Sequence, residues 1–145
     1  NHYRLWEPDA AWMANWEKWS GKPFIITEFY TKGEDSGLPN NTGAGWNVRT
    51  QADRGWFYQN FVTELLRSGN CVGWHWFTYM DNDPQNLKTD PSNRDSNKGV
   101  VAWNFEHYTV LLDEMKQLID CTYRLIRHLD AEKTEANRKT TDNHE

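Results

Sequence analysis

The sequence contains 145 residues, of which 37% are hydrophobic and 26% are charged, and a single domain of this length buries roughly 68–70% of the surface of its unfolded chain. The 21 Asp and Glu residues outnumber the 16 Lys and Arg residues and give a formal net charge of −5. A mildly acidic chain lacks the positive field that attracts nucleic acid, and its apolar runs fall well short of the ~20 residues needed to cross a bilayer. We therefore expect neither a nucleic-acid nor a membrane partner.

Helical and extended patterns alternate along the chain. In order, the hydrophobic periodicity predicts a helix over 9–19, a strand over 23–27 that is buried on both faces, a loop over 30–48, a helix over 51–68, a strand over 71–77, a polar loop over 81–97 and a long amphipathic helix over 108–129. Helices that alternate with strands indicate an α/β fold with a parallel sheet.

The connections between these elements differ in length. The helix-to-strand connections, residues 20–22 and 69–70, are short, whereas the strands are followed by the long polar loops over 30–48 and 81–97. In α/β sheets and barrels, the long loops at the carboxyl ends of the strands carry function and the opposite end contributes stability. We therefore expect the functional residues at the carboxyl ends of the two strands.

The C-terminal residues 131–145 contain no apolar side chain larger than alanine. Such a segment can bury almost no apolar surface, which predicts a frayed helix end or a disordered tail. We expect the folded unit to span residues 1–130.

Glu28 is the first candidate for a catalytic group. It directly follows the apolar run 24–27, so it lies where a buried strand ends at the functional edge. Rigid backbone holds a carboxylate there, and nearby groups can tune its pKa. From the residues alone, a structural carboxylate paired with a neighbouring Arg or Lys is an equally good interpretation.

Trp74, His75 and Trp76 end the second strand. Alternation along a strand sends the two tryptophans to one face and His75 to the other, unless a bulge intervenes. Core packing of the tryptophans and a buried structural role for His75 are the alternatives to a binding site. The acidic residues Asp81 and Asp83 follow closely, and they favour the binding site.

Motifs for metals and cofactors are incomplete. The run 81–83 lacks the glycine and the distal glutamate of a calcium loop, and the run 43–45 lacks the third glycine of a dinucleotide fingerprint. Cys71 and Cys121 have no metal-binding spacing, which indicates free buried thiols. We predict no metal and no cofactor.

The aromatic content points to carbohydrate. The chain has 9 Trp, 6 Tyr and 6 Phe, which make 14% of its residues. Pyranose faces are apolar and stack on indole rings, while sugar hydroxyls need carboxylate, amide or imidazole partners. Cleavage of a glycosidic bond requires two carboxyl groups, and Glu28 is the one good candidate for that pair.

Three blocks of the sequence are similar to a known enzyme family. The segments ITEFYTKGEDSGLPN (26–40), GAGWNVRTQADRGWFYQNF (43–61) and NCVGWHWFTYMDNDP (70–84) resemble the C-terminal third of β-agarases of glycoside hydrolase family 50, and resemble family 86 less closely. The resemblance covers about residues 1–119 and includes SNRDSNKGVVAWNFEHY (92–108). It implies a (β/α)₈ barrel and a retaining hydrolase that cleaves β-1,4 galactosidic bonds in agarose-type galactans.

The resemblance also implies roles for individual residues. By position, Glu28 matches the nucleophile at the end of the seventh barrel strand. The resemblance places the substrate-binding residues at the ends of strands six to eight and in the loops that follow: His2, Tyr3, Tyr30, Trp46, Trp74, His75, Trp76, Asp81 and Asp83.

The general acid/base of such enzymes is absent from the sequence. In this clan it is a glutamate at the end of the fourth strand, whereas a whole barrel needs at least ~200 residues. We therefore expect residues 1–130 to be the C-terminal part of a barrel, inactive alone, with a galactan and the remainder of its own barrel as partners. The resemblance implies a secreted or periplasmic enzyme. A non-catalytic carbohydrate-binding remnant and a structural piece that needs a partner fragment are the alternatives.

Overall fold

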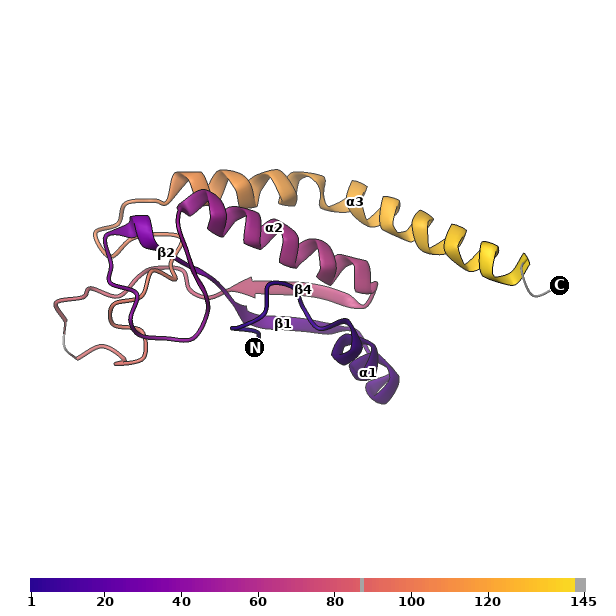
Figure 1. Ribbon diagram of the computed structural model, residues 1–145, viewed down its shortest axis with the longest axis horizontal. Coiled ribbons are helices and arrows are strands. Elements are labelled where there is room, and N and C mark those ends of the chain that lie inside the picture. Colours follow the sequence, from indigo (N-terminus) through magenta and orange to yellow (C-terminus); the bar gives the residue numbers. More distant parts are fainter. Residues whose placement is uncertain (87, 143–145) are drawn as a thin grey trace.

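The computed structural model describes residues 1–86 and 88–142. Its elements are α1 (Ala10–Ser20), β1 (Phe24–Phe29), β2 (Lys32–Gly33), the 3₁₀ helix η1 (Glu34–Ser36), β3 (Asn47–Val48), α2 (Gln51–Ser68), β4 (Cys71–Trp76) and α3 (Thr109–Asp142) (Figure 1). This mixed arrangement confirms the predicted α/β class. None of the helices among these residues is long and apolar enough to cross a membrane.

The ends of α1 and α2 follow from local capping. Thr50 and Asp53 form a capping box at the start of α2, and Gly69 ends this helix in the left-handed conformation with φ 81°. The side chain of Asp9 accepts a hydrogen bond from the backbone nitrogen of Trp12 and begins α1, which Gly21 ends in the same way as Gly69 ends α2. The sequence prediction for α2 is confirmed at both ends, and α1 is shifted by one residue.

The main sheet consists of β1 and β4, which lie side by side and run parallel. His2 forms a further parallel bridge to Phe29, on β1. The long loops gather at the end of the sheet to which the arrow of β4 points (Figure 1). Within the segment predicted as a loop, β2 and β3 form a short parallel pair in which Lys32 donates its backbone N–H to the carbonyl of Trp46 at 2.9 Å.

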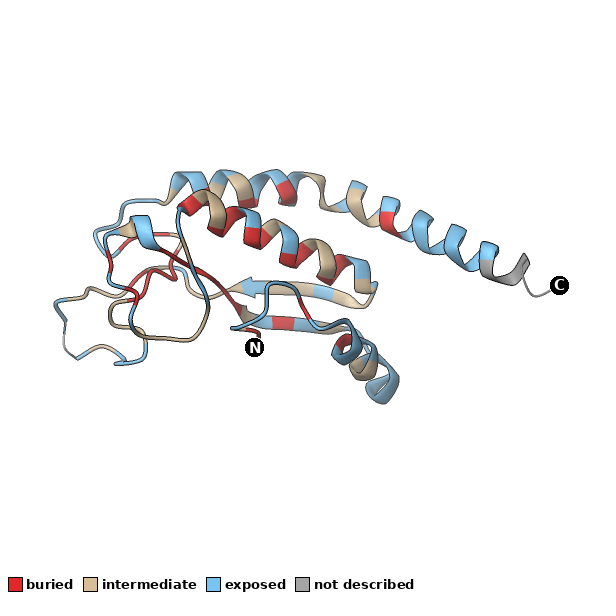
Figure 2. Ribbon diagram, viewed as in Figure 1, coloured by how far each residue is buried: buried red, intermediate tan, exposed pale blue. Residues whose placement is uncertain are grey.

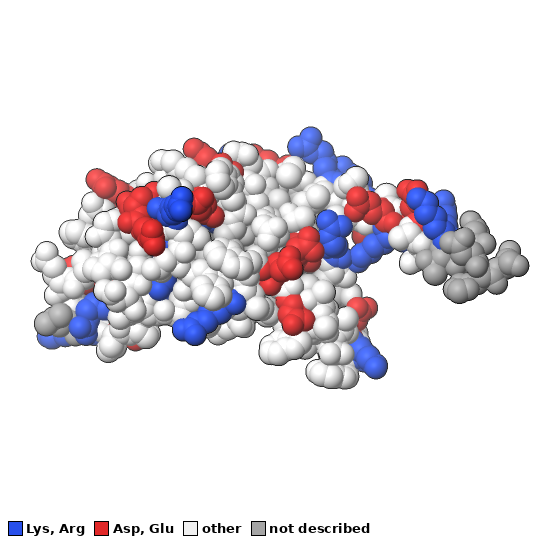
Figure 3. All heavy atoms as spheres, in the orientation of Figure 1, with Lys and Arg blue, Asp and Glu red and all other residues white. Residues whose placement is uncertain are grey.

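The core lies between the sheet and the helices α2 and α3. Figure 2 shows the buried residues along α2 and on its neighbours, and the fully buried apolar side chains include Phe29, Phe61, Leu65 and Leu111. Acidic and basic side chains are interspersed over the face shown in Figure 3, as expected for a low net charge.

The opposite face of the sheet is open among the described residues. Ile25 is 50% exposed and Val72 is 69% exposed. The prediction that the first strand is buried on both faces is therefore wrong for this chain, because the described helices α2 and α3 cover the other face.

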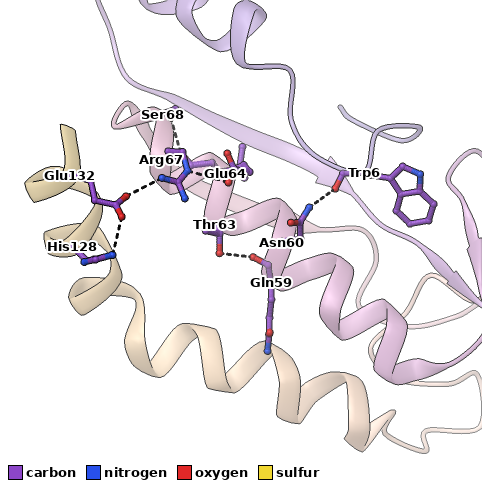
Figure 4. Close-up of polar contacts among 10 residues, drawn as sticks. Trp6, Gln59, Asn60, Thr63, Glu64, Arg67, Ser68, His128 and Glu132 are labelled. Carbon is purple, nitrogen blue, oxygen red and sulfur yellow. Dashed lines mark hydrogen bonds and ion pairs between the residues drawn. The ribbon is translucent and has the colours of Figure 1, made fainter. Parts of the chain in front are cut away.

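The C-terminal half of α3 extends past the sheet (Figure 1). Glu132 forms an ion pair with Arg67 at 3.2 Å, which joins α3 to the end of α2, and it contacts His128 one turn earlier in α3, also at 3.2 Å (Figure 4). The helix continues to Asp142 through most of the segment predicted as a frayed helix end or disordered tail. That prediction stays untested, and its last residues, 143–145, lie outside the described part of the chain.

Candidate active site

A cleft of about 390 Å³ opens at the carboxyl end of β1. Glu28 lies in β1, and Tyr30 and Phe77 directly follow β1 and β4. Both long loops and the N-terminal segment complete the lining, with Tyr3, Gly43, Ala44, Asp90, Ser92, Asn93 and Lys98. The cleft therefore lies at the edge of the sheet where the sequence placed the functional face.

The two loops that form the cleft are held together by hydrogen bonds. The carboxylate of Asp95 accepts hydrogen bonds from the backbone nitrogens of Asn41 at 3.0 Å and Thr42 at 2.8 Å. The ammonium group of Lys32 donates to the carbonyl oxygens of Asn40 at 3.0 Å and Thr42 at 3.2 Å. The Asp95 contacts fix residues 41–42 against the loop that carries Lys98, and the Lys32 contacts hold the first loop in shape.

A bulge in β1 turns Glu28 away from the helices. Ile26 and Phe29 are both buried in the core although they are three residues apart, and the register with β4 is irregular between them. Thr27 and Glu28 are therefore on the open face. The half-buried carboxylate of Glu28 makes no hydrogen bond or ion pair to the described residues, so the alternative of a structural ion pair finds no partner there.

Lys98 supplies a buried cation to the same cleft. Its Nζ lies 4.8 Å from the ring centre of Tyr30 and 5.7 Å from that of Phe77, and it donates to the side chain of Asn93. Burial, together with the charge of Lys32, lowers the pKa of Lys98 to about 8, against the opposing effect of Glu28 and nearby aspartates. The cleft thus combines a carboxylate that has no hydrogen-bond or ion-pair partner among the described residues with a buried ammonium group.

Two tyrosines form a wall of the cleft. The rings of Tyr3 and Tyr30 are tilted by 55° with their centres 5.3 Å apart. Burial, together with the negative charge of Glu28, raises the pKa of Tyr30 to about 12. Tyr30 therefore keeps its proton at neutral pH and can donate a hydrogen bond into the cleft.

His2 contributes its backbone to this region, whereas its ring faces the core. The backbone nitrogen of His2 donates to the carbonyl of Glu28 at 2.8 Å, but the ring packs edge-on against Trp16 and Phe61, with centres 5.8 and 6.0 Å apart. Neither ring nitrogen has a partner among the described residues, and burial lowers the pKa of His2. The substrate-binding role predicted for His2 has no support from the position of its side chain.

The residues at the end of β4 divide between the two faces of the sheet. Trp74 Nε1 donates to the hydroxyl of Tyr58 at 2.9 Å, Trp76 Nε1 donates to the carbonyl of Lys98 at 2.7 Å, and both rings pack against the core. This placement favours the packing interpretation for both tryptophans. His75 is exposed on the opposite face, the face of Glu28, so the alternative of a buried core histidine is wrong.

The remaining predicted residues lie outside the cleft. Asp81 is buried and accepts hydrogen bonds from the backbone nitrogens of Lys98 at 2.7 Å and Gly99 at 2.6 Å, so it holds the segment that carries Lys98. Asp83 accepts from the backbone nitrogen of Gln85 and stabilises a turn. Trp46 is stacked on Trp6, with ring centres 5.8 Å apart.

Solved structures are similar to this chain in both sequence and fold. The crystal structure of BpGH50 is 41% identical with a TM-score of 0.79, and the match covers 90% of this chain and 26% of that chain. The structure of an exo-β-agarase is 26% identical with a TM-score of 0.71, and the match covers 87% and 16%. The chain is a relative of the GH50 agarases. This confirms the resemblance that the sequence blocks carry.

A third solved structure shows the same fold at lower identity. The agarase AgWH50C is 20% identical with a TM-score of 0.69, over 86% of this chain and 18% of that chain. No family model and no curated protein matches the chain significantly. The chain spans about a quarter or less of these GH50 structures, so the activity, substrate and partners of a whole enzyme are proposals for it.

In this GH50 relative, Arg54 and Lys98 are buried cations that the sequence analysis did not identify. Arg54 is 0% exposed and lies in α2, where it donates to the carbonyls of Thr31 at 3.0 Å and Gly99 at 2.9 Å. Lys98 lies in a polar loop that has no periodicity. A signal for Arg54 exists in the sequence, because its position falls among the apolar residues on the buried face of a predicted helix.

Among the described residues, no group of three or more metal-ligating side chains is present.

Proposed function

We propose that this chain is the nucleophile-bearing part of a retaining glycoside hydrolase that cleaves β-1,4 galactosidic bonds in agarose-type galactans. The observation that carries the proposal is Glu28, a carboxylate without a partner among the described residues at the carboxyl end of a strand, in a cleft walled by tyrosines. Kinship with GH50 agarases supports the glycosidase assignment.

The open face of the sheet supports a place in a larger barrel. His2, β1 and β4 provide three parallel segments in a row, and α2 and α3 cover one side of them. In a (β/α)₈ barrel the other side of these strands is covered by side chains of the remaining strands. The exposed Ile25 and Val72 are apolar residues of the kind that such an interior contains.

The chemistry divides between this chain and the remainder of the barrel. Glu28 attacks the anomeric carbon, the glycosidic bond breaks, and a covalent glycosyl-enzyme forms while an acid protonates the leaving oxygen. Having given up its proton, the same carboxyl group then acts as a base and removes a proton from the water that hydrolyses the intermediate, and it must lie ~5–5.5 Å from Glu28. Lys98 places a positive charge in the same cleft as Glu28, and Tyr30 offers a hydroxyl to the sugar.

Substitution of Glu28 tests the proposal. In a full-length protein that contains this chain, Glu28→Ala should abolish turnover and leave galactan binding nearly unchanged, because the lost interaction belongs to the transition state. Azide should then restore cleavage and yield a glycosyl azide of inverted configuration. Glu34→Ala, in the exposed helix η1, is the matched control and should retain activity. Near-normal turnover in Glu28→Ala would refute the proposal.

A further inference from the structure

A second pocket, of about 540 Å³, lies on the outer surface between the segment before α1 and the first half of α2. It shares no lining residue with the cleft that contains Glu28. Its lining is aromatic with a few polar side chains: Trp6, Val48, Arg49, Asp53, Trp56, Phe57 and Asn60.

Two indole rings border this pocket and remain in contact with solvent. Trp6 is 52% exposed and Trp56 is 58% exposed. Two contacts fix the position of Trp6. Its ring stacks on Trp46 at an interplanar angle of 9°. Its carbonyl accepts a hydrogen bond from Asn60 Nδ2 at 3.1 Å (Figure 4). The pocket therefore offers fixed, flat apolar surface to a ligand.

The polar groups of the pocket are few and balanced in charge. Arg49 is exposed and makes no hydrogen bond or ion pair to the described residues. Asp53 is engaged in the capping box with Thr50, and Asn60 donates from Nδ2 to the carbonyl of Trp6. The pocket thus combines one cation and one anion with free donors beside indole faces.

We propose that this pocket is a second, non-catalytic sugar-binding site. A neutral pyranose has an apolar face that stacks on indole and hydroxyls that bond to guanidinium and amide groups, whereas a phosphate ligand would leave the carboxylate of Asp53 unfavourably placed. The choice of a galactose unit as the sugar rests on the proposed function. Such a site holds the polysaccharide on the enzyme while the cleft acts on another part of the chain.

The test is the binding of a soluble neutral agarose hexasaccharide to the 145-residue chain. Calorimetry measures the affinity, and the indole N–H signals in NMR spectra report which tryptophans the sugar contacts. The indole signal of Trp56, assigned by its loss in Trp56→Ala, should shift on titration. Trp56→Ala should weaken binding roughly two- to tenfold, as expected for the loss of one aromatic stacking partner. Trp19→Ala, which removes a tryptophan that is 74% exposed and outside the pocket, should bind as the native chain does.

Two results would overturn the inference: no shift of the Trp56 signal, or equal affinities for Trp56→Ala and the native chain. The proposed function fails separately. If Glu28→Ala in the full-length protein retains turnover while Trp56→Ala weakens binding, the hydrolytic assignment is wrong and the sugar-binding pocket stands.

Discussion

Arg54 is a buried side chain that supports the candidate site from the core, so its loss should destabilise the segments that form the cleft. Its guanidinium is completely buried and donates to the carbonyls of Thr31 and Gly99 and, at 2.7 Å, to Gln51 Oε1. It also lies 5.4 Å from the ring centre of Trp76. Arg54 therefore joins α2 to the residue after Tyr30 and to the residue after Lys98, on both sides of the cleft.

The size of the effect follows from these acceptors. In Arg54→Met, three buried oxygens lose their donor, and each buried acceptor without a partner costs ~1–3 kcal/mol. The apolar replacement removes the desolvation cost of the charge, which offsets part of this loss. We expect the free energy of unfolding to fall by ~3–5 kcal/mol.

Thermal and urea unfolding of the chain, followed by circular dichroism, measures this change. For 145 residues the entropy of unfolding is about 0.3 kcal/mol per kelvin, so the melting temperature should fall by ~10–16 °C. Arg67→Met is the control, because Arg67 is a half-exposed arginine of the same helix whose ion pairs with Glu64 and Glu132 contribute ~0–1 kcal/mol. Equal melting temperatures for the two variants would refute the role assigned to Arg54.

Three further outcomes are expected. The chain alone should release no reducing ends from agarose, because the proposed mechanism assigns general acid catalysis, worth ~10²–10⁴ in rate, to the remainder of the barrel; release at a rate typical of glycosidases would contradict this. Burial lowers the pKa of Lys98 from 10.5 to about 8, so the unfolded chain binds more protons between these values and stability should rise with pH there. Lys98→Met should lack this rise in urea unfolding at pH 7.5 and 9.5, whereas the exposed Lys18→Met should keep it. Trp46→Ala in the full-length protein should weaken oligosaccharide binding by ~0.5–1.5 kcal/mol, because it removes the ring that stacks on Trp6; native affinity with a much lower melting temperature would assign Trp46 to packing.

Local signals in the sequence were enough to place α1 and α2. Thr50, Asp53 and Gly69 fix both ends of α2 through short-range hydrogen bonds, and short-range contacts are visible in a sequence. The pairing of β2 with β3 was missed because two-residue strands carry no periodicity and depend on contacts between distant segments. The exposure of Ile25 has a similar origin, because the burial of a sheet face depends on which distant segments pack against it.

The candidate site was predictable only in part. Glu28 could be placed from its position after an apolar run, and Tyr3 and Tyr30 do line the same cleft. The directions of Trp74 and Trp76 could not be derived, because bulges in β1 and β4 set the phase of both strands. Their exposure and partners follow from that phase, and a sequence does not show where a bulge falls.

Labelling of Glu28 tests the central claim most directly. A 2-deoxy-2-fluoro galactoside with a good leaving group forms a glycosyl-enzyme with a retaining hydrolase and slows its hydrolysis, so the nucleophile stays labelled. In a full-length protein that contains this chain, peptide mass spectrometry should find the label on Glu28 and no label in Glu28→Ala. A label on Glu34 or Asp35, or cleavage with inversion and no label, would contradict the account.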